Sequence, residues 1–361
     1  MIAFILLGLG CLATLWLLAR VYLSGENLAR FDADTGQRFA SGRPPSAHLA
    51  GAMARLTNAA APAKLAPRRE RMAITRKQFD HMFDDRVFSA AFTPVDVDGV
   101  RGEWVLAPGA APGRRMLYLH GGGFRVGSAY SHRTITARMS ELSGGAVLAL
   151  DYRLMPEHKR QACVDDSRNA YRWMLENGPD GAAPAQAVFV AGDSAGANLT
   201  LSLLAWVRDQ GLRAADAAVV LSPPTDGTLA SPSVRANIAS DFMLGPAFGT
   251  VARLPRTLTL WVGWLQSGIR PNDPLVSPIY GDLSRLPPLL VHASETEMLF
   301  DDARRYVNRA RAAGSQATLQ SWNHTLHVWH IFNPELPEAR EAFAEIGKFL
   351  AAAAPLPEAP L

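Results

Sequence analysis

Short apolar runs alternate with segments of helical periodicity along most of the chain. The runs are four to six residues long, as expected for strands buried on both faces of a sheet. Strands that alternate with helices predict a parallel sheet with helices on both faces. The predicted strands are 115–119, 146–150, 188–191, 217–221, 289–293 and 317–322. The predicted helices are 132–142, 162–176, 197–209, 301–313 and 338–350.

Two alternating stretches precede these runs. Residues 93–98 and 102–106 alternate polar and apolar positions around Asp98-Gly99, which predicts a hairpin. Upstream, residues 40–77 are rich in alanine, proline and arginine, with helical patterns at about 47–59 and 72–83. The body of the protein is therefore expected to begin near residue 88, after an arm.

The apolar segment 2–19 is much longer than the strand-like runs. It carries no charge, and as a helix it would span about 27 Å, close to the hydrocarbon thickness of a bilayer. Trp16 and Tyr22 are spaced to lie at an interface. A cleaved signal peptide would need a basic start and a small-residue cleavage site, and both are missing. Residues 1–23 are therefore predicted to form an uncleaved membrane anchor.

Positive charge is concentrated near the N-terminus. The net charge is +3, but residues 1–77 hold eleven Lys/Arg against four Asp/Glu, so the remainder carries about −4. Basic residues after a membrane span favour the cytoplasmic side and attract anionic lipid. We therefore expect a membrane protein with its body on the cytoplasmic face. The few aromatic residues in the arm argue against nucleic-acid binding, and two cysteines, Cys11 and Cys163, cannot make a disulfide framework.

The pentapeptide Gly192-Asp193-Ser194-Ala195-Gly196 joins a predicted strand to a predicted helix. Glycines two residues before and after the serine permit a sharp turn where a Cβ would meet a neighbouring element. At a helix N-terminus, free amides and the helix dipole favour negative charge. This is the pattern of a nucleophile elbow, so Ser194 is the predicted nucleophile.

A second glycine-rich motif, His120-Gly121-Gly122-Gly123-Phe124, follows the strand 115–119. Consecutive glycines lose much backbone freedom on folding, so they are costly unless the site needs them. They are useful where backbone amides must face a ligand with no side chain between them. The amides of Gly122, Gly123 and Ala195 are predicted to form an oxyanion hole. His120 and Gly121 are predicted to support the loop.

These motifs resemble those of the bacterial hormone-sensitive-lipase-like esterases of the α/β-hydrolase fold, close to monoterpene epsilon-lactone hydrolases. The resemblance covers residues 88–350, and its further carriers are Asp151-Tyr152-Arg153-Leu154-Met155-Pro156-Glu157-His158, Asp273-Pro274-Leu275-Val276-Ser277-Pro278 and His327-Val328-Trp329-His330.

The resemblance implies an eight-stranded, mostly parallel sheet with helices on both faces and a helical cap. It also implies no cofactor, and hydrolysis of short to medium acyl esters or lactones. The expected division is an anchor (1–23), a basic arm with part of the cap (24–87), a catalytic domain (88–353) with a cap insertion at about 227–266, and a tail (354–361). The oligomeric state is left open.

The resemblance also selects partners for Ser194. Many family members have Asp-Pro-Leu-x-Asp where this chain reads Glu297-Met298-Leu299-Phe300-Asp301-Asp302. Alignment on Leu299 makes Glu297 the predicted acid. Glu295, two residues earlier, would point elsewhere along an extended segment. His327 is the predicted base, with His324 as its main rival. The His-x-x-His spacing lacks a carboxylate partner, so no metal is predicted.

Bulky side chains are predicted to line the acyl or alcohol pocket, although core packing explains them nearly as well. They are Phe124, Phe242, Met243, Leu244, Trp261 and Trp264. A thioesterase or a peptidase on the same fold is the alternative reaction. A non-catalytic ligand-binding homologue is the other alternative, but it would be expected to lose a triad position, and none is missing.

Overall fold

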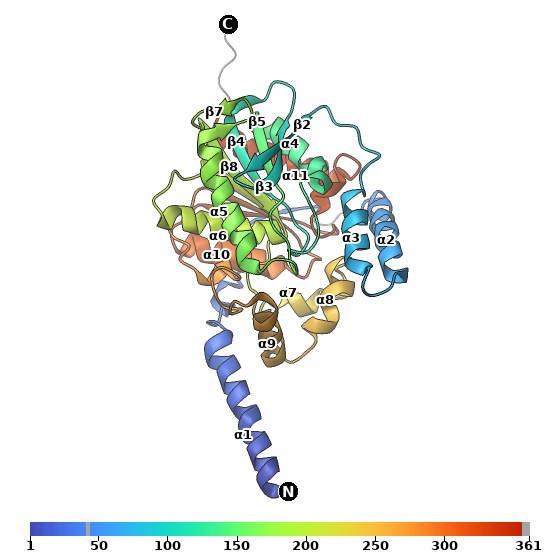
Figure 1. The fold of residues 1–361 in the computed structure, drawn as a ribbon, viewed down its shortest axis with the longest axis vertical. Coiled ribbons are helices and arrows are strands. Elements are labelled where there is room, and N and C mark those ends of the chain that lie inside the picture. Colours follow the sequence, from blue (N-terminus) through green and yellow to red (C-terminus); the bar gives the residue numbers. More distant parts are fainter. Residues whose placement is uncertain (41–43, 356–361) are drawn as a thin grey trace.

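The structure, a computed structural model, describes residues 1–40 and 44–355. At the centre of this part of the chain is a nine-stranded sheet (Figure 1). The strands are β1 (Gln37–Phe39), β2 (Ala91–Val97), β3 (Val100–Leu106), β4 (Ala111–Leu119), β5 (Gly145–Leu150), β8 (Ala187–Asp193), β9 (Ala217–Leu221), β10 (Leu289–Ser294) and β11 (Ala317–Trp322). Their order is β1-β11-β10-β9-β8-β4-β5-β3-β2. The pairs β2–β3 and β3–β5 are antiparallel, and the other neighbours are parallel.

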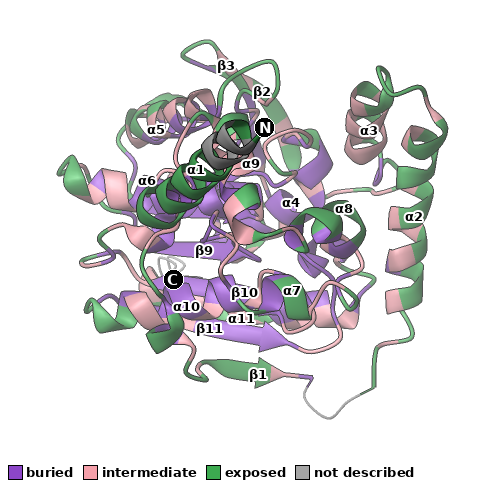
Figure 2. Cartoon of the chain, turned by 90° about the horizontal axis from the view of Figure 1, so that it is seen from below, coloured by how far each residue is buried: buried purple, intermediate pink, exposed green. Residues whose placement is uncertain are grey.

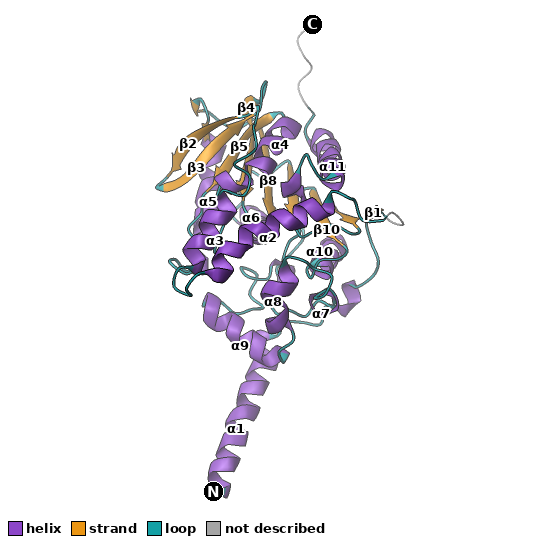
Figure 3. Cartoon of the chain, turned by 90° about the vertical axis from the view of Figure 1, so that its right-hand side faces the viewer, coloured by secondary structure: helices purple, strands orange, loops and turns teal. Residues whose placement is uncertain are grey.

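Helices cover both faces of this sheet (Figures 2 and 3). One face packs against α4 (Arg133–Ser143) and α11 (Pro337–Ala353), and the other packs against α5 (Arg160–Glu176), α6 (Ala195–Asp209) and α10 (Phe300–Ala312). Successive strand residues point to opposite faces. In β4, Met116 and Tyr118 therefore pack in the hydrophobic core on the side of α4 and α11. Leu117 and Leu119 pack in the core on the side of α5, α6 and α10. Burial on both faces explains why the strands are continuous apolar runs.

The remaining elements lie in the N-terminal region and in the loops. The helices are α1 (Ile2–Leu18), α2 (Leu49–Leu65), α3 (Arg71–Asp80), α7 (Ser233–Ala236), α8 (Leu244–Ala252) and α9 (Arg256–Ser267). Short turns are a π-helical one at Ala19–Leu23 and 3-10 ones at Ala29–Phe31, Tyr130–His132, Pro278–Tyr280 and Trp329–Phe332. A two-stranded hairpin pairs β6 (Asn177–Gly178) with β7 (Gly181–Ala182). We call residues 227–266, which contain α7, α8 and all of α9 except its last residue, the cap segment.

This architecture confirms the predicted α/β-hydrolase fold with its mostly parallel sheet. The six predicted parallel strands and the five predicted helices of the body all occur, with ends shifted by a few residues. The hairpin at Asp98-Gly99 is also present, since Val97 pairs with Val100 where β2 meets β3. Of the predicted tail, residues 356–361 lie outside the described residues.

The expected number of eight strands is too small by one. The additional strand, β1, comes from the predicted arm and pairs with β11, with Gln37 opposite Gln320 and Phe39 opposite Trp322. It has three residues, and Gln37 and Arg38 are exposed. So short and polar a strand has no apolar periodicity, and the sequence therefore gives no sign of it.

The predicted membrane anchor is wrong. The α-helix α1 has 17 residues and is thus about 25 Å long. Among the helices of the described residues, none combines the length and the apolar character that crossing a bilayer requires. The π-helical turn that follows α1 packs on the cap segment, where Ala19 and Leu23 are buried against Leu260. The cytoplasmic placement of the body was predicted from this anchor, so that prediction is wrong as well.

One arginine of the basic arm packs it on the body, and another joins two parts of the arm. The Arg76 guanidinium donates to the carbonyl oxygen of Arg125 (2.7 Å) and to the Glu157 carboxylate (2.7 and 2.9 Å). Arg55 makes a two-bond contact with Asp85, at 2.7 Å for each bond. Arg76 therefore holds the arm to the body, and Arg55 holds two parts of the arm together.

Candidate active site

The turn between β8 and α6 has the form of the predicted elbow. Ser194 lies between the two elements with φ 49° and ψ −117°, a conformation that costs energy for a residue with a Cβ. A Cβ at Gly192 would lie 2.7 Å from backbone atoms of Gly196, and one at Gly196 would lie 1.8 Å from the carbonyl oxygen of Leu119. Both glycines are therefore required by close backbone approach.

A continuous chain of hydrogen bonds runs from Ser194 through His327 to Glu297. The Nε2 atom of His327 lies 2.9 Å from Ser194 Oγ, and its Nδ1 atom lies 2.6 Å from Glu297 Oε2. The other carboxylate oxygen of Glu297 accepts the N–H of Ser294 at 2.9 Å. If Nδ1–H donates to the carboxylate, Nε2 is left with the lone pair that a hydroxyl proton needs.

These three residues meet because each follows a parallel strand. Ser194 follows β8, Glu297 follows β10 and His327 follows β11. The carboxyl ends of parallel strands lie along one edge of a sheet, which is where ligands meet such folds. Residues more than a hundred positions apart in the chain are thereby brought within hydrogen-bond distance.

Electrostatics favour a charged form of the histidine. Burial alone lowers the pKa of His327, but the hydrogen bond and charge of Glu297, with the charges of Asp241 and Asp193, outweigh burial and raise it. Burial raises the pKa of Glu297, and the hydrogen bond from His327 opposes that rise. An imidazolium that forms at His327 is therefore stabilised by the acidic groups around it.

The glycine-rich loop is held against the elbow by Asp193. This carboxylate accepts the Gly121 N–H at 2.9 Å and the Tyr118 hydroxyl at 2.7 Å. A Cβ at Gly121 would lie 2.1 Å from Asp193 Oδ2, and Gly122 has φ +111°. Within the described part of the chain, the N–H groups of three residues of the glycine-rich loop and the elbow have no protein acceptor. They are Gly122, Gly123 and Ala195.

His120 makes contacts suited to the support of this loop. Its Nδ1 atom lies 2.7 Å from the Gly121 carbonyl oxygen, and its ring stacks on Tyr152 with centroids 4.3 Å apart. Burial lowers the pKa of His120 to about 4, so the ring is neutral at pH 7. A polar cavity of about 400 Å³ lies behind the loop, lined by His120, Asp151 and Arg101 among others, and the elbow serine is not part of its lining.

Glu295 and His330, which lie close to the predicted acid and base in the sequence, make other contacts. The Glu295 carboxylate accepts the Ser321 hydroxyl at 2.8 Å and pairs with Arg38. His330 is buried 3.0 Å from His292, and burial lowers the pKa of both rings, that of His292 to about 3. Within the described part of the chain, no group of three or more His, Cys, Asp or Glu side chains is arranged to hold a metal ion.

The six predicted pocket residues are spread over several contacts. The Phe124 ring lies 3.9 Å from the Arg160 guanidinium carbon, Phe242 packs against the core under α4 and α11, and Leu244 packs near Met298. Met243 is half-buried beside them. Trp261 donates its indole N–H to the Leu15 carbonyl oxygen, and Trp264 packs edge-on against Tyr22. The two tryptophans thus hold the N-terminal segment, and a pocket role for all six stays a prediction.

Two residues close to the acid were not singled out from the sequence. Asn237 and Asp241 lie in the cap segment, yet they contact the main chain on both sides of Glu297. No short motif links them to Glu297, which lies more than fifty residues further along. Their polar character in a segment of bulky apolar residues was the available signal.

The chain is similar to known proteins in both sequence and structure. The profile of a family with the α/β-hydrolase fold matches residues 116–331. An acetyl-hydrolase from Streptomyces hygroscopicus is 40% identical over 256 residues, which are 71% of this chain and 81% of that protein. The crystal structure of an esterase from the bacterial hormone-sensitive lipase family is 35% identical with a TM-score of 0.70, and covers 83% of this chain and 97% of its own. EstE5, whose crystal was soaked with p-nitrophenyl butyrate, is 34% identical with a TM-score of 0.68 over 83% of this chain and 98% of its own.

The family match spans the strands from most of β4 to β11, the elbow, the glycine-rich loop and the segments that carry Glu297 and His327. The family match covers more than half of the chain, and the acetyl-hydrolase is 40% identical over most of its length. A shared fold alone does not require such similarity. The chain therefore belongs to the hormone-sensitive-lipase-like esterases of the α/β-hydrolase family and is an enzyme that hydrolyses esters.

Proposed function

We propose that Ser194, His327 and Glu297 are the catalytic triad of this ester hydrolase. The observation that carries the proposal is the unbroken hydrogen-bond chain from the serine hydroxyl to the buried carboxylate. A serine is a weak nucleophile unless a neighbouring base takes its proton. In the proposed triad, His327 is that base, and the Glu297 carboxylate fixes the tautomer of its ring.

In the proposed reaction, His327 Nε2 takes the Ser194 proton as Oγ attacks the ester carbonyl carbon. Glu297 stabilises the imidazolium that results. The N–H groups of Gly122, Gly123 and Ala195 donate hydrogen bonds to the oxyanion. None of them has to give up a hydrogen bond to a protein acceptor to do so.

The tetrahedral intermediate then collapses. His327 gives its proton to the leaving alkoxide, which departs as an alcohol, and an acyl group stays on Ser194. Water, deprotonated by His327, attacks the carbonyl carbon of this acyl-serine. His327 then returns the proton to Ser194 Oγ as the acyl C–O bond breaks, and the carboxylic acid is released. No step needs a cofactor, because each proton that moves has a donor and an acceptor among these residues.

The substrates that we propose are esters or lactones with short to medium acyl groups. A relative is named for acetyl hydrolysis, and another was soaked with a butyrate ester. We infer that the cap segment, with part of the arm, closes over the serine, and that Phe124, Phe242, Met243 and Leu244 contribute apolar surface. Each buried methylene of the acyl chain stabilises the complex by about 0.8 kcal/mol until the pocket is full.

A fluorophosphonate probe tests the triad directly. We expect one adduct per chain, on the peptide that contains Ser194, because the probe requires an activated serine. His327→Ala should slow the labelling at least about a hundredfold, since general-base assistance of that size is lost. Ser202→Ala, in the same helix, should label at the wild-type rate. Rapid labelling of a different serine would remove the basis for the proposal.

An acyl-length series tests the pocket. With p-nitrophenyl esters from acetate to palmitate, kcat/KM should rise to a medium length and fall beyond about eight carbons, once the closed pocket is full. Matched thioester and anilide substrates, measured alongside, separate ester hydrolysis from the thioesterase and peptidase alternatives. A continuous increase to palmitate would instead indicate an open, lipase-like groove.

A further inference from the structure

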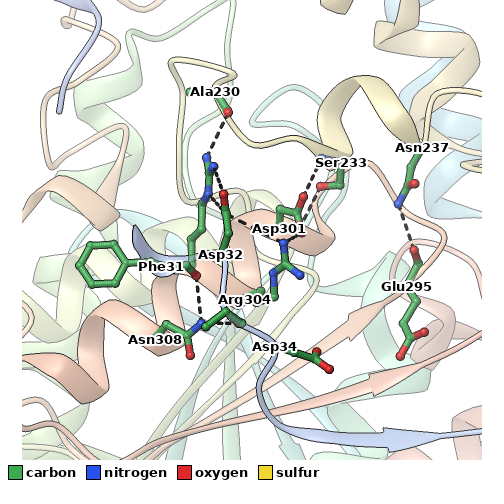
Figure 4. A network of polar contacts seen from close by, with 12 residues as sticks. Phe31, Asp32, Asp34, Ala230, Ser233, Asn237, Glu295, Asp301, Arg304 and Asn308 are labelled. Carbon is green, nitrogen blue, oxygen red and sulfur yellow. Dashed lines mark hydrogen bonds and ion pairs between the residues drawn. The ribbon is translucent and has the colours of Figure 1, made fainter. Parts of the chain in front are cut away.

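The loop that carries Glu297 is fixed by the cap segment. We call residues 295–301 the acid loop. The side-chain amide of Asn237 donates to the carbonyl oxygens of Glu295 (3.0 Å) and Glu297 (2.9 Å), and Figure 4 shows the first of these contacts. One turn earlier, the Ser233 hydroxyl donates to the Met298 carbonyl oxygen at 2.8 Å. Two residues of the cap segment thus bind the main chain on both sides of the acid.

The contact is reciprocal at the end of the acid loop. The Asp301 carboxylate accepts the Ser233 N–H at 2.8 Å, and the Asp301 N–H donates to the Ser233 hydroxyl oxygen at 2.9 Å. Figure 4 shows that the same cluster includes Arg304 and Asp32. Arg304 pairs with Asp301 at 2.8 Å, and Asp32 lies 3.9 Å from Arg304. Segments from three parts of the sequence therefore hold the loop.

Asp241 is the charged member of this clamp. Its Oδ2 atom accepts the Met298 N–H at 2.7 Å, directly beside Glu297. Its Oδ1 atom accepts the N–H groups of Met243 (3.0 Å) and Leu244 (2.8 Å), at the start of α8. The residue is only 3% exposed. Three backbone N–H groups thus fix this buried carboxylate, so a second carboxylate lies next to the Glu297 site.

This charge adds to the field at the base. The acidic groups that act on His327 are Glu297 from the loop after β10, Asp193 from the end of β8 and Asp241 from the cap segment. Glu297 is the hydrogen-bond partner of the imidazole, and Asp193 is committed to the glycine-rich loop. Asp241 is the one of the three that belongs to the cap segment.

We infer that Asp241 is a positioning residue, which fixes the main chain beside Glu297 and adds a second negative charge behind the Glu297–His327 pair. The cap segment thereby takes part in holding the acid, in addition to any role in covering the substrate. The inference rests on the proposed triad, because Asp241 acts through Glu297 and His327 and touches no reacting atom.

Two substitutions separate position from charge. Asp241→Asn removes the charge and turns an amide N–H₂ toward a backbone donor, whereas Asp241→Glu keeps the charge but displaces it by one methylene. We expect kcat on a p-nitrophenyl ester to fall up to about 100-fold in both variants, since a small misplacement of catalytic groups has effects of that size. KM should change much less, because the substrate does not touch Asp241.

The pH profile distinguishes the two effects. Asp241 raises the pKa of His327, so its loss should lower that pKa. The base must be neutral to accept the serine proton, and the acid limb of kcat/KM should therefore move to lower pH in Asp241→Asn. In Asp241→Glu the limb should stay close to that of the wild type. A purely structural role would reduce activity without moving the limb.

A matched control is Asp216→Asn. Asp216 also accepts a backbone N–H, that of Val188 at 2.7 Å, but it lies before β9, at the opposite end of the sheet from the site. This variant should keep the wild-type limb even if its melting temperature falls. An Asp241→Asn enzyme with an unmoved limb, or with wild-type kcat, would overturn the inference and leave the triad intact. A wild-type enzyme without esterase activity would instead overturn the triad proposal itself.

Discussion

Replacement of Ser194 by alanine should lower kcat/KM for ester hydrolysis by about four to six orders of magnitude, as loss of a triad nucleophile does in other serine hydrolases. The residual rate comes from the oxyanion hole and from substrate binding, which do not need the hydroxyl. Initial rates on a short p-nitrophenyl ester, with enzyme purified free of host esterases, measure the effect. Retention of a tenth of the wild-type activity would contradict the assignment of the nucleophile.

The same position makes a prediction about stability. Because Ser194 has φ 49°, part of the folding free energy is spent on a conformation that glycine adopts freely. Ser194→Gly should therefore be inactive but more stable than Ser194→Ala, by about 1 kcal/mol in the free energy of unfolding. Urea unfolding of the two variants, followed by circular dichroism, makes the comparison without any dependence on activity.

Much of the body could be predicted because its signals are local and redundant. Strands such as β8 are buried on both faces, so they appear as uninterrupted apolar runs. The elbow and the glycine-rich loop are set by backbone constraints that only glycine satisfies, and at Gly196 a Cβ would lie 1.8 Å from a carbonyl oxygen. Constraints of this kind can be recognised in the sequence from four or five consecutive residues.

The N-terminal region could not be predicted in the same way. The apolar composition of residues 2–19 is what a membrane span requires, but composition does not say where a helix ends or what it packs on. In the structure, Leu23 is buried against Leu260, and Tyr22 meets Trp264, which the sequence suggested as a pocket wall. These contacts join positions about 240 residues apart, and no periodicity reports them.

The acid loop shows a third limit. Glu297 was found by alignment to a family pattern, whereas Asn237 and Asp241, which hold its main chain, were not found at all. Polar residues that bind a distant backbone leave no repeating pattern, because each contact is made once. Only the folded chain brings the cap segment and the acid loop together.

The choice between two neighbouring glutamates provides the second large effect. Glu297→Gln should lower kcat by about three to four orders of magnitude, because loss of the triad carboxylate charge has effects of that size. If the amide turns its oxygen to His327, the tautomer is kept but the imidazolium loses its counter-charge. If it turns its N–H₂ to the ring, Nδ1 becomes an acceptor and Nε2 carries the proton, so the base cannot take the serine hydrogen.

Glu295→Gln is the matched control, two residues away. Its carboxylate accepts the Ser321 hydroxyl and pairs with Arg38, so its substitution changes a contact that does not reach His327. We expect it to keep kcat within about threefold of the wild type, since a partly exposed ion pair contributes little. The pH profiles should also differ. Glu297 raises the pKa of His327, so the acid limb of any residual activity should move to lower pH in Glu297→Gln alone. If Glu295→Gln were the more damaging of the two, the acid would be Glu295, and the hydrogen bond between Glu297 and His327 would have to be a structural contact.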